Sequence, residues 1–233
     1  MEANARVVRA LGEGDGRLLQ GERAMRRSSS RSQIVKARLQ EVASDFFYRR
    51  GIRAVGINEI TITAGVTKPT LYRFFPSKDA MVEDCVAADA DRMLSVAHHL
   101  LANIEDRGQL AKAIGRLLAL DTRSHQGRGL FLLNVAVEYP EAGHPVREIV
   151  ASAVQGLRAR LAAVLSSGVA DAGTAAAAAD HIILLIQGAS AGCHSLGCKA
   201  SVEALETSVE TVLQHYNFAG PLTLRRALQA TAH

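Results

Sequence analysis

The chain has 233 residues, no tryptophan and five prolines, and its formal net charge at pH 7 is +4. This length accommodates a small binding unit and one larger core, and the alanine- and leucine-rich sequence favours an all-helical protein. No apolar run reaches the roughly 18 to 20 residues of a membrane span, and the N-terminus lacks a signal-peptide pattern. Three cysteines do not form a disulfide framework in a chain this long. We therefore expect a cytoplasmic protein with no membrane partner.

Charge is distributed unevenly along the chain. Residues 31–80 carry nine Lys or Arg against four Asp or Glu, whereas residues 81–233 carry twelve against fifteen. A basic unit followed by a mildly acidic body is expected if only the first part approaches a polyanion. The alternative is that the basic residues form an ordinary solvent-exposed face that binds no partner.

Residues 1–30 are predicted to be a disordered basic tail. Four glycines interrupt any helix there, and the segment Arg26-Arg27-Ser28-Ser29-Ser30 is polar. One alternative is a translation start that truly lies at Met25. Another is an arm that follows a DNA backbone through Arg26, Arg27 and Arg31.

The apolar pattern then predicts a helix over residues 34–50 that ends at Gly51, and a second helix that begins near Ile57. Ile57, Ile60 and Ala64 recur at helical spacing and mark one buried face. Gly65 follows directly, and glycine adopts the left-handed conformation at little cost, so the chain can turn there.

A third helix is predicted immediately after this turn. Thr67 is a suitable N-cap, Pro69 is tolerated in a first turn, and Leu71 and Phe75 face inward. Ser77 caps the next helix, which places Lys78 at a helix start, where a cation is disfavoured unless an anion such as phosphate binds there. The side chains left on the outer side are Lys68, Thr70, Tyr72 and Arg73. Two short helices joined at a glycine, with such groups on the second, are typical of a helix-turn-helix DNA reader.

The whole string resembles the DNA-binding domain of TetR-family transcriptional regulators over about residues 34–82. The matching positions are Phe46, Phe47, Gly51, Ile60, Ala64, Gly65, Val66, Thr67, Lys68, Thr70, Leu71, Tyr72, Phe75, Ser77 and Lys78. The sequence departs from the family pattern at Thr61, where alanine is usual, and at Gly56, which offers no hydroxyl to a phosphate. The resemblance implies that DNA is bound by Thr67, Lys68, Pro69, Thr70, Tyr72, Arg73 and Lys78. Tyr72 and Lys78 would contact phosphate, and Lys68, Pro69, Thr70 and Arg73 would read bases.

After Ser77 the pattern predicts six further helices, over about residues 78–103, 109–122, 128–138, 145–168, 174–195 and 201–217. The predicted breaks include Gly108, Gly127, Gly168, Gly173 and Gly197. The expected organisation is all-α: a tail over 1–30, a three-helix DNA-binding head over 31–80, a ligand-binding and dimerisation domain over 81–220, and a tail or short helix over 221–233.

The last two main helices have the composition of a dimer interface. Residues 182–186 are apolar on nearly all sides, which requires burial on more than one side. The resemblance implies that these helices pair with their copies in a homodimer, so that two heads read two half-sites. The alternative is burial inside one subunit. The candidate interface residues are Ile182, Leu185, Gly188, Gly192, Leu205, Val209 and Val212.

The resemblance also implies a cavity for a small apolar or amphipathic effector in the body. Candidate lining residues place polar or bulky groups on otherwise apolar stretches, although each is compatible with ordinary core or surface. They are Met93, His98, Phe131, Asn134, Val135, Glu138, Gln187 and His194. We expect an effector to act on the head through the helix that begins at Lys78, as the single connection between head and body.

The segment Cys193-His194 with Cys198 suggests a metal site or a thiol switch. No second pair of metal ligands stands nearby, and adjacent residues on a helix point about 100° apart, so Cys193 and His194 cannot easily share a proton. We predict no metal, no cofactor and no catalytic residues. The sequence therefore predicts a dimeric, ligand-responsive, DNA-binding regulator that acts as a repressor. The alternatives are a thiol-responsive regulator and an all-helical enzyme or lipid carrier.

Overall fold

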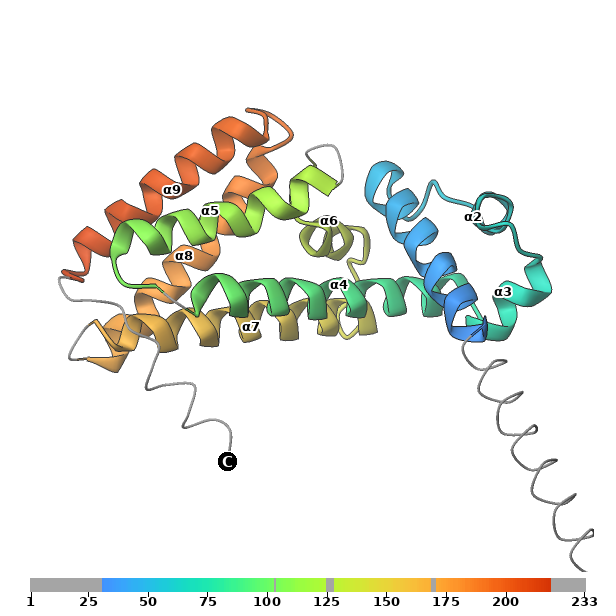
Figure 1. The fold of residues 1–233 in the computed structure, drawn as a ribbon, viewed down its shortest axis with the longest axis horizontal. Coiled ribbons are helices and arrows are strands. Elements are labelled where there is room, and N and C mark those ends of the chain that lie inside the picture. Colours follow the sequence, from blue (N-terminus) through green and yellow to red (C-terminus); the bar gives the residue numbers. More distant parts are fainter. Residues whose placement is uncertain (1–30, 103, 125–127, 169–170, 219–233) are drawn as a thin grey trace, which may run out of the picture.

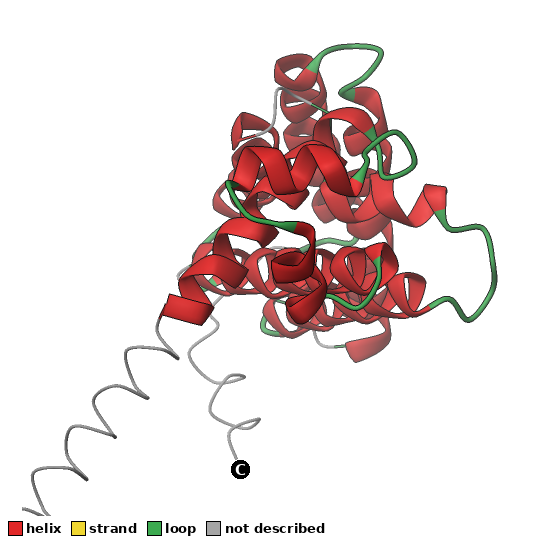
Figure 2. Cartoon of the chain, turned by 90° about the vertical axis from the view of Figure 1, so that its right-hand side faces the viewer, coloured by secondary structure: helices red, strands yellow, loops and turns green. Residues whose placement is uncertain are grey.

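The computed structural model describes residues 31–102, 104–124, 128–168 and 171–218, and all regular structure within these ranges is helical (Figures 1 and 2). A first helix covers residues 31–50. The later helices are α2 (Ile57–Ala64), α3 (Lys68–Phe74), α4 (Lys78–Leu101), α5 (Arg107–Ser124), α6 (Phe131–Glu138), α7 (Pro145–Ser166), α8 (Ala172–Gly192) and α9 (Cys198–His215). The predicted all-α class is confirmed. The expected tails over 1–30 and 221–233 lie outside the described residues, as does the predicted break at Gly127.

The helix ends in the head follow the local chemistry of the sequence. Gly65 has φ +68° and ends α2 in the left-handed conformation, which only glycine adopts cheaply. The Thr67 side chain accepts a hydrogen bond from the Thr70 amide at the start of α3. Ser77 Oγ accepts one from the Ala80 amide at 2.9 Å and begins α4 in the same way.

Two glycines predicted as breaks lie inside helices instead. Gly108 is in the first turn of α5, and Gly173 is in the first turn of α8. Asp106 Oδ1 accepts from the Gln109 amide at 2.8 Å, and Asp171 accepts from the Gly173 and Thr174 amides. Because an aspartate N-cap satisfies the free amides of a first turn, each helix starts before its glycine.

The first helix, α2 and α3 form a head at one end of the molecule, and α5, α8 and α9 lie in the body toward the other end (Figure 1). The head is held by side chains that are at most 2% exposed, among them Leu39, Phe47, Ile60, Leu71 and Phe75. Helix α4 starts in the head and continues into the body, so the boundary expected at residues 80 and 81 falls within its first turn.

The body is a helical bundle in which α4 packs on α7, α7 on α8, α8 on α9, and α9 on α5. Helices α7 and α8 are long and apolar enough to cross a membrane by length and composition. Helices buried in the core of a soluble protein meet the same criterion, and both helices here pack against other helices of the bundle.

Candidate nucleic-acid interface

Helix α3 presents its polar side chains to solvent. Leu71, on the inner side of this helix, is fully buried, whereas Tyr72 is 47% exposed. The other exposed residues of this surface are Thr67, Lys68, Pro69 and Arg73, and Thr70 is half-buried. Six of the seven residues predicted to bind DNA therefore lie together on or beside one short helix.

Two local contacts organise this surface. The hydroxyls of Thr67 and Thr70 lie 2.9 Å apart, and the Thr70 amide donates to Thr67 Oγ1. The Arg73 guanidinium lies over the Phe74 ring, 4.9 Å from its centroid. A guanidinium stacked on an aromatic ring loses part of its conformational freedom before it binds, which favours specific recognition.

Lys78, the seventh predicted contact, is placed differently. Its side chain is half-buried, and its Nζ donates to the main-chain carbonyl of Ile52 at 2.6 Å. The lysine at the start of α4 thus satisfies a carbonyl in the turn after the first helix. The phosphate contact expected of Lys78 stays a prediction, because the hydrogen bond to Ile52 uses one of the three donors of the ammonium.

Glu138, predicted to line an effector cavity, also binds the head. Its carboxylate accepts from the Ile52 amide at 2.9 and 3.0 Å and from the Arg53 amide at 3.1 Å. Gly51 has φ +81°, and a Cβ there would lie 3.2 Å from Glu138 Oε1. Lys78 and Glu138 therefore hold the carbonyl and the amide of one residue, Ile52.

A pocket of about 320 Å³ adjoins this contact, between the head and α6. Its wall includes Glu138 and Tyr139, and the Tyr139 ring lies 4.3 Å from the ring of His144. Burial, followed by the nearby Asp79 and Glu138 carboxylates, raises the pKa of Tyr139 to about 12. The phenol stays protonated at neutral pH, so it can donate a hydrogen bond in this pocket.

A second contact joins head and body near the start of α6. The Tyr48 hydroxyl donates to the Gly129 carbonyl at 2.7 Å and accepts from the Arg128 amide at 3.0 Å. The Arg128 side chain donates to the carbonyls of Tyr48 and Arg49. The expectation that the helix beginning at Lys78 alone connects head and body is therefore wrong.

The predicted effector-lining residues do not gather around one cavity. Met93 lines a narrow cavity of about 10 Å³ between α4, α5 and residues 130–132, which has room for about one water. Phe131 and Val135 are core residues, and the Asn134 side chain donates to the Arg128 carbonyl. His98 and His194 are exposed, and Gln187 is half-buried. The Asp89–Arg92 ion pair lies at the edge of this cavity.

The predicted dimer residues separate into two groups. Ile182, Leu205 and Val209 are at most 2% exposed inside one subunit. Leu185 and Val212 are half-buried, and a Cβ on Gly192 would lie 3.0 Å from Ser201 Oγ on the neighbouring α9. Among the predicted residues, Gly188 has open space around it.

Sequence reasoning noted that Gly188 and Ala191 allow a close approach of another helix, but it did not recognise the exposed stripe to which they belong. Leu184 is 64% exposed, and Ala191 is exposed on the same side of α8. Exposed small residues on α9 are Ala200, Ala204, Thr207 and Thr211. Their spacing of three and four residues indicates one helix face and could have identified the stripe from the sequence. The opposite face of each helix is more apolar and was chosen instead.

The cysteines are free thiols. Burial, followed by the hydrogen-bonded Cys198 thiol, raises the pKa of Cys193 to about 12, and burial raises the pKa of Cys85 to about 12. Because the thiolate is the reactive form, these two positions are poor nucleophiles at neutral pH. Within the described ranges no three His, Cys, Asp or Glu side chains gather as a metal site.

Known proteins are similar to this chain both in the sequence of the head and in the fold. Residues 39–85 match the family model of bacterial regulatory proteins of the tetR family. The crystal structure of SCO4454, a TetR-family transcriptional regulator from Streptomyces coelicolor, is 30% identical with a TM-score of 0.67. The alignment covers 78% of this chain and 95% of that protein. This chain belongs to the TetR family of transcriptional regulators. The prediction of a regulator rather than an enzyme is confirmed by this membership.

Two curated relatives of this TetR-family protein carry functional names. The transcriptional activator FasR from Mycolicibacterium smegmatis is 30% identical over 113 residues, and the transcriptional repressor KstR2 from Rhodococcus jostii is 27% identical over 112 residues. Each alignment covers 48% of this chain and 52% of the relative. The chain thus spans about half the length of these curated relatives.

Proposed function

We propose that this TetR-family protein is a homodimeric repressor that binds a palindromic DNA operator and is released by a small-molecule effector. The observation that carries DNA binding is the exposed set on and beside α3, which lies inside the matched segment 39–85. Helix α3 follows a glycine turn after α2, and this is the position of the recognition helix in a helix-turn-helix.

The exposed residues have chemistry suited to distinct parts of a DNA duplex. The Tyr72 phenol can donate to a phosphate, whereas Lys68 and Arg73 can donate to the acceptor edge of guanine. The Pro69 ring and the Thr70 methyl can pack on a thymine methyl. In this proposal Lys78 supports the head from within, through its hydrogen bond to Ile52.

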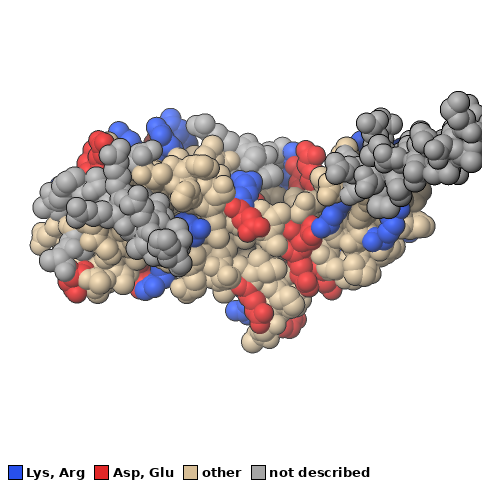
Figure 3. Space-filling model, turned by 60° about the horizontal axis from the view of Figure 1, so that its bottom comes forward, with Lys and Arg blue, Asp and Glu red and all other residues tan. Residues whose placement is uncertain are grey.

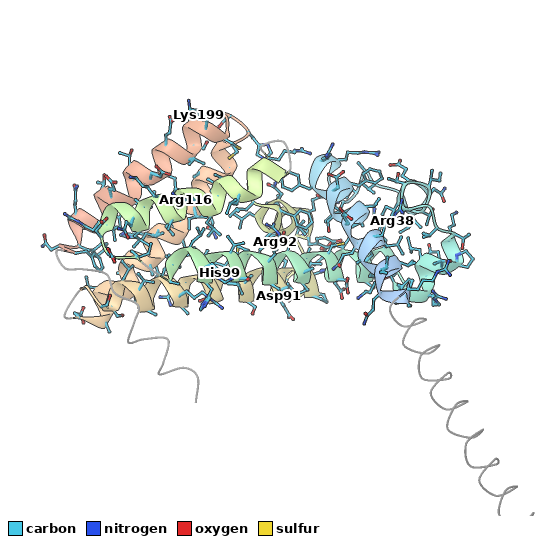
Figure 4. All side chains as sticks on the ribbon, in the orientation of Figure 1. Arg38, Asp91, Arg92, His99, Arg116 and Lys199 are labelled. Carbon is cyan, nitrogen blue, oxygen red and sulfur yellow. The ribbon has the colours of Figure 1, made fainter. Side chains whose placement is uncertain are left out.

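The operator itself can be obtained by selecting random duplexes with the full chain. With Arg73→Ala, we expect the base preference to relax at one symmetric pair of positions in the operator. The binding free energy lost at those positions should be about 1 to 3 kcal/mol, and little should be lost elsewhere. Arg116→Ala is the matched control, because Arg116 is exposed on α5 of the body (Figure 4). A selected motif identical for wild type and Arg73→Ala would reject this role.

Dimer formation would place two heads on the two half-sites of a palindrome. We assign the contact face to the exposed stripe of α8 and α9 that contains Leu184, Gly188 and Ala191. Small residues on both helices allow close approach of a second bundle. On the face shown in Figure 3, where the structure describes it, charges of both signs are interspersed with wide uncharged areas.

We assign the effector site to the narrow cavity lined by Met93, Val96, Leu117, Leu130 and Leu132. Its apolar wall suits an apolar or amphipathic molecule. Because the cavity has room for only about one water, a ligand must push the helices apart to enter, and that movement is what would alter the head. FasR is named an activator and KstR2 a repressor, so a reporter under the selected operator tests the direction of regulation.

Effector and operator should weaken each other's binding by the same factor. A coupling of about 1 to 3 kcal/mol corresponds to roughly 5- to 150-fold in affinity. Titrating a candidate effector with and without operator DNA, and operator with and without the effector, measures this factor from both sides. Equal effector affinities in the two titrations would show that the compound is not the inducer.

A further inference from the structure

The segment before α6 lies directly against α8. The Leu130 amide donates to Ser190 Oγ at 2.7 Å, and both Leu130 and Ser190 are buried. Gly129 has φ +78°, and a Cβ there would lie 2.4 Å from the Ser190 carbonyl oxygen. Glycine is therefore required at this position both for its backbone conformation and for space.

The same segment holds the first helix of the head. Tyr48 is 3% exposed, and its hydroxyl is both a donor to Gly129 and an acceptor from Arg128. The Tyr48 ring also packs near Phe131 of α6, with ring centroids 6.1 Å apart. A buried hydroxyl that both donates and accepts a hydrogen bond holds the two segments in place, because displacing it leaves buried polar groups unpaired.

The Glu138 carboxylate provides a second attachment at the other end of α6. It accepts from the amides of Ile52 and Arg53, in the turn between the first helix and α2. Gly51 again permits the close approach through its positive φ. Both ends of α6 are therefore fastened to the head, and neither contact passes through α4.

We propose that Tyr48, Ser190 and Glu138 are positioning residues that set the head against the body, and that residues 128–130 connect α8 to the first helix. A displacement of α8 at Ser190 is then transmitted to the head by a path separate from α4. Leu130 also lines the narrow cavity, so a molecule entering there would push on this path. The attachment is independent of the proposed function, whereas its regulatory use rests on it.

Hydrogen–deuterium exchange of the full chain tests the path. We expect Ser190→Ala and Tyr48→Phe each to raise exchange in peptides covering residues 48–56 by about two- to tenfold. Ser190 is far from these residues in sequence, so a rise there reports transmission. The double variant should exchange no faster than the faster single variant. Tyr72→Phe is the matched control, because Tyr72 is exposed on α3.

A second pair of variants tests the Glu138 attachment. Glu138→Gln removes the negative charge that the two amides share, whereas Glu59→Gln makes the same change in an exposed ion pair with Arg50 inside the head. We expect faster exchange at Ile52 and Arg53 in Glu138→Gln and wild-type exchange there in Glu59→Gln. Unchanged protection of α7 amides in all variants shows that the body remains folded.

Two outcomes separate this inference from the proposed function. If Ser190→Ala loosens only α8 and leaves residues 48–56 at wild-type exchange, the path is refuted, even when the wild-type protein binds its selected operator. If residues 48–56 respond but the wild-type protein selects no DNA, the attachment stands and the proposed function fails. If the path and the proposed function both hold, Ser190→Ala should change operator affinity while the selected base preference stays the same.

Discussion

Leu71→Ala should lower the free energy of unfolding by about 2 to 5 kcal/mol, because it opens a cavity in the small core of the head. Leu71 is fully buried, and Ile60 and Phe75 belong to the same buried cluster. A head built from one longer helix and the two short helices α2 and α3 has few other apolar contacts with which to compensate. Chemical denaturation followed by circular dichroism measures the loss, and operator binding should fall with it because Leu71 is the buried residue that anchors α3 in the head.

Ile62→Ala is the control for this experiment. Ile62 lies on α2 in the same head but is 79% exposed, so its truncation removes little buried surface. We expect its free energy of unfolding to stay within about 0.5 kcal/mol of wild type. If Leu71→Ala were as mild as Ile62→Ala, the buried face assigned to α3 would be wrong, and so would the set of residues on its outer side.

Gly188→Leu should dissociate the dimer without unfolding the subunit. A Cβ at Gly188 meets nothing within 4 Å in the subunit, so the larger side chain fits the isolated chain. In the proposed dimer the same space is taken by the partner's helices. Overpacking costs about 1 to 3 kcal/mol per site, and each dimer contains two copies, so the dissociation constant should rise on the order of a hundredfold or more. Analytical ultracentrifugation measures it.

Two further substitutions identify the origin of that effect. Gly192→Leu should destabilise the subunit itself, because a Cβ there already lies 3.0 Å from Ser201 Oγ of α9. Ala151→Leu adds similar bulk to an exposed position of α7 and should leave the dimer unchanged. If Ala151→Leu dissociated the dimer and Gly188→Leu did not, the dimer interface would lie on α7 instead.

Much of the fold was readable from local chemistry. Gly65 with its positive φ, the Thr67 and Ser77 caps and the inward Leu71 each depend on neighbours within a few residues, so the helix-turn-helix was predicted almost residue by residue. The body helices were found within a few residues of their ends for the same reason. The early starts of α5 and α8 were missed because the capping aspartates were not weighed against the glycines.

The amino-acid sequence by itself determined the helices, the exposed face of α3 and the family. Only the tertiary structure decided the partners of Lys78 and Glu138, which meet at Ile52, and those of Tyr48, which meets Gly129 some 81 positions away. It also decided which faces of α8 and α9 stay exposed. The physical reason is that helical periodicity shows which side chains share a face, whereas hydrogen bonds between distant segments depend on how whole helices pack.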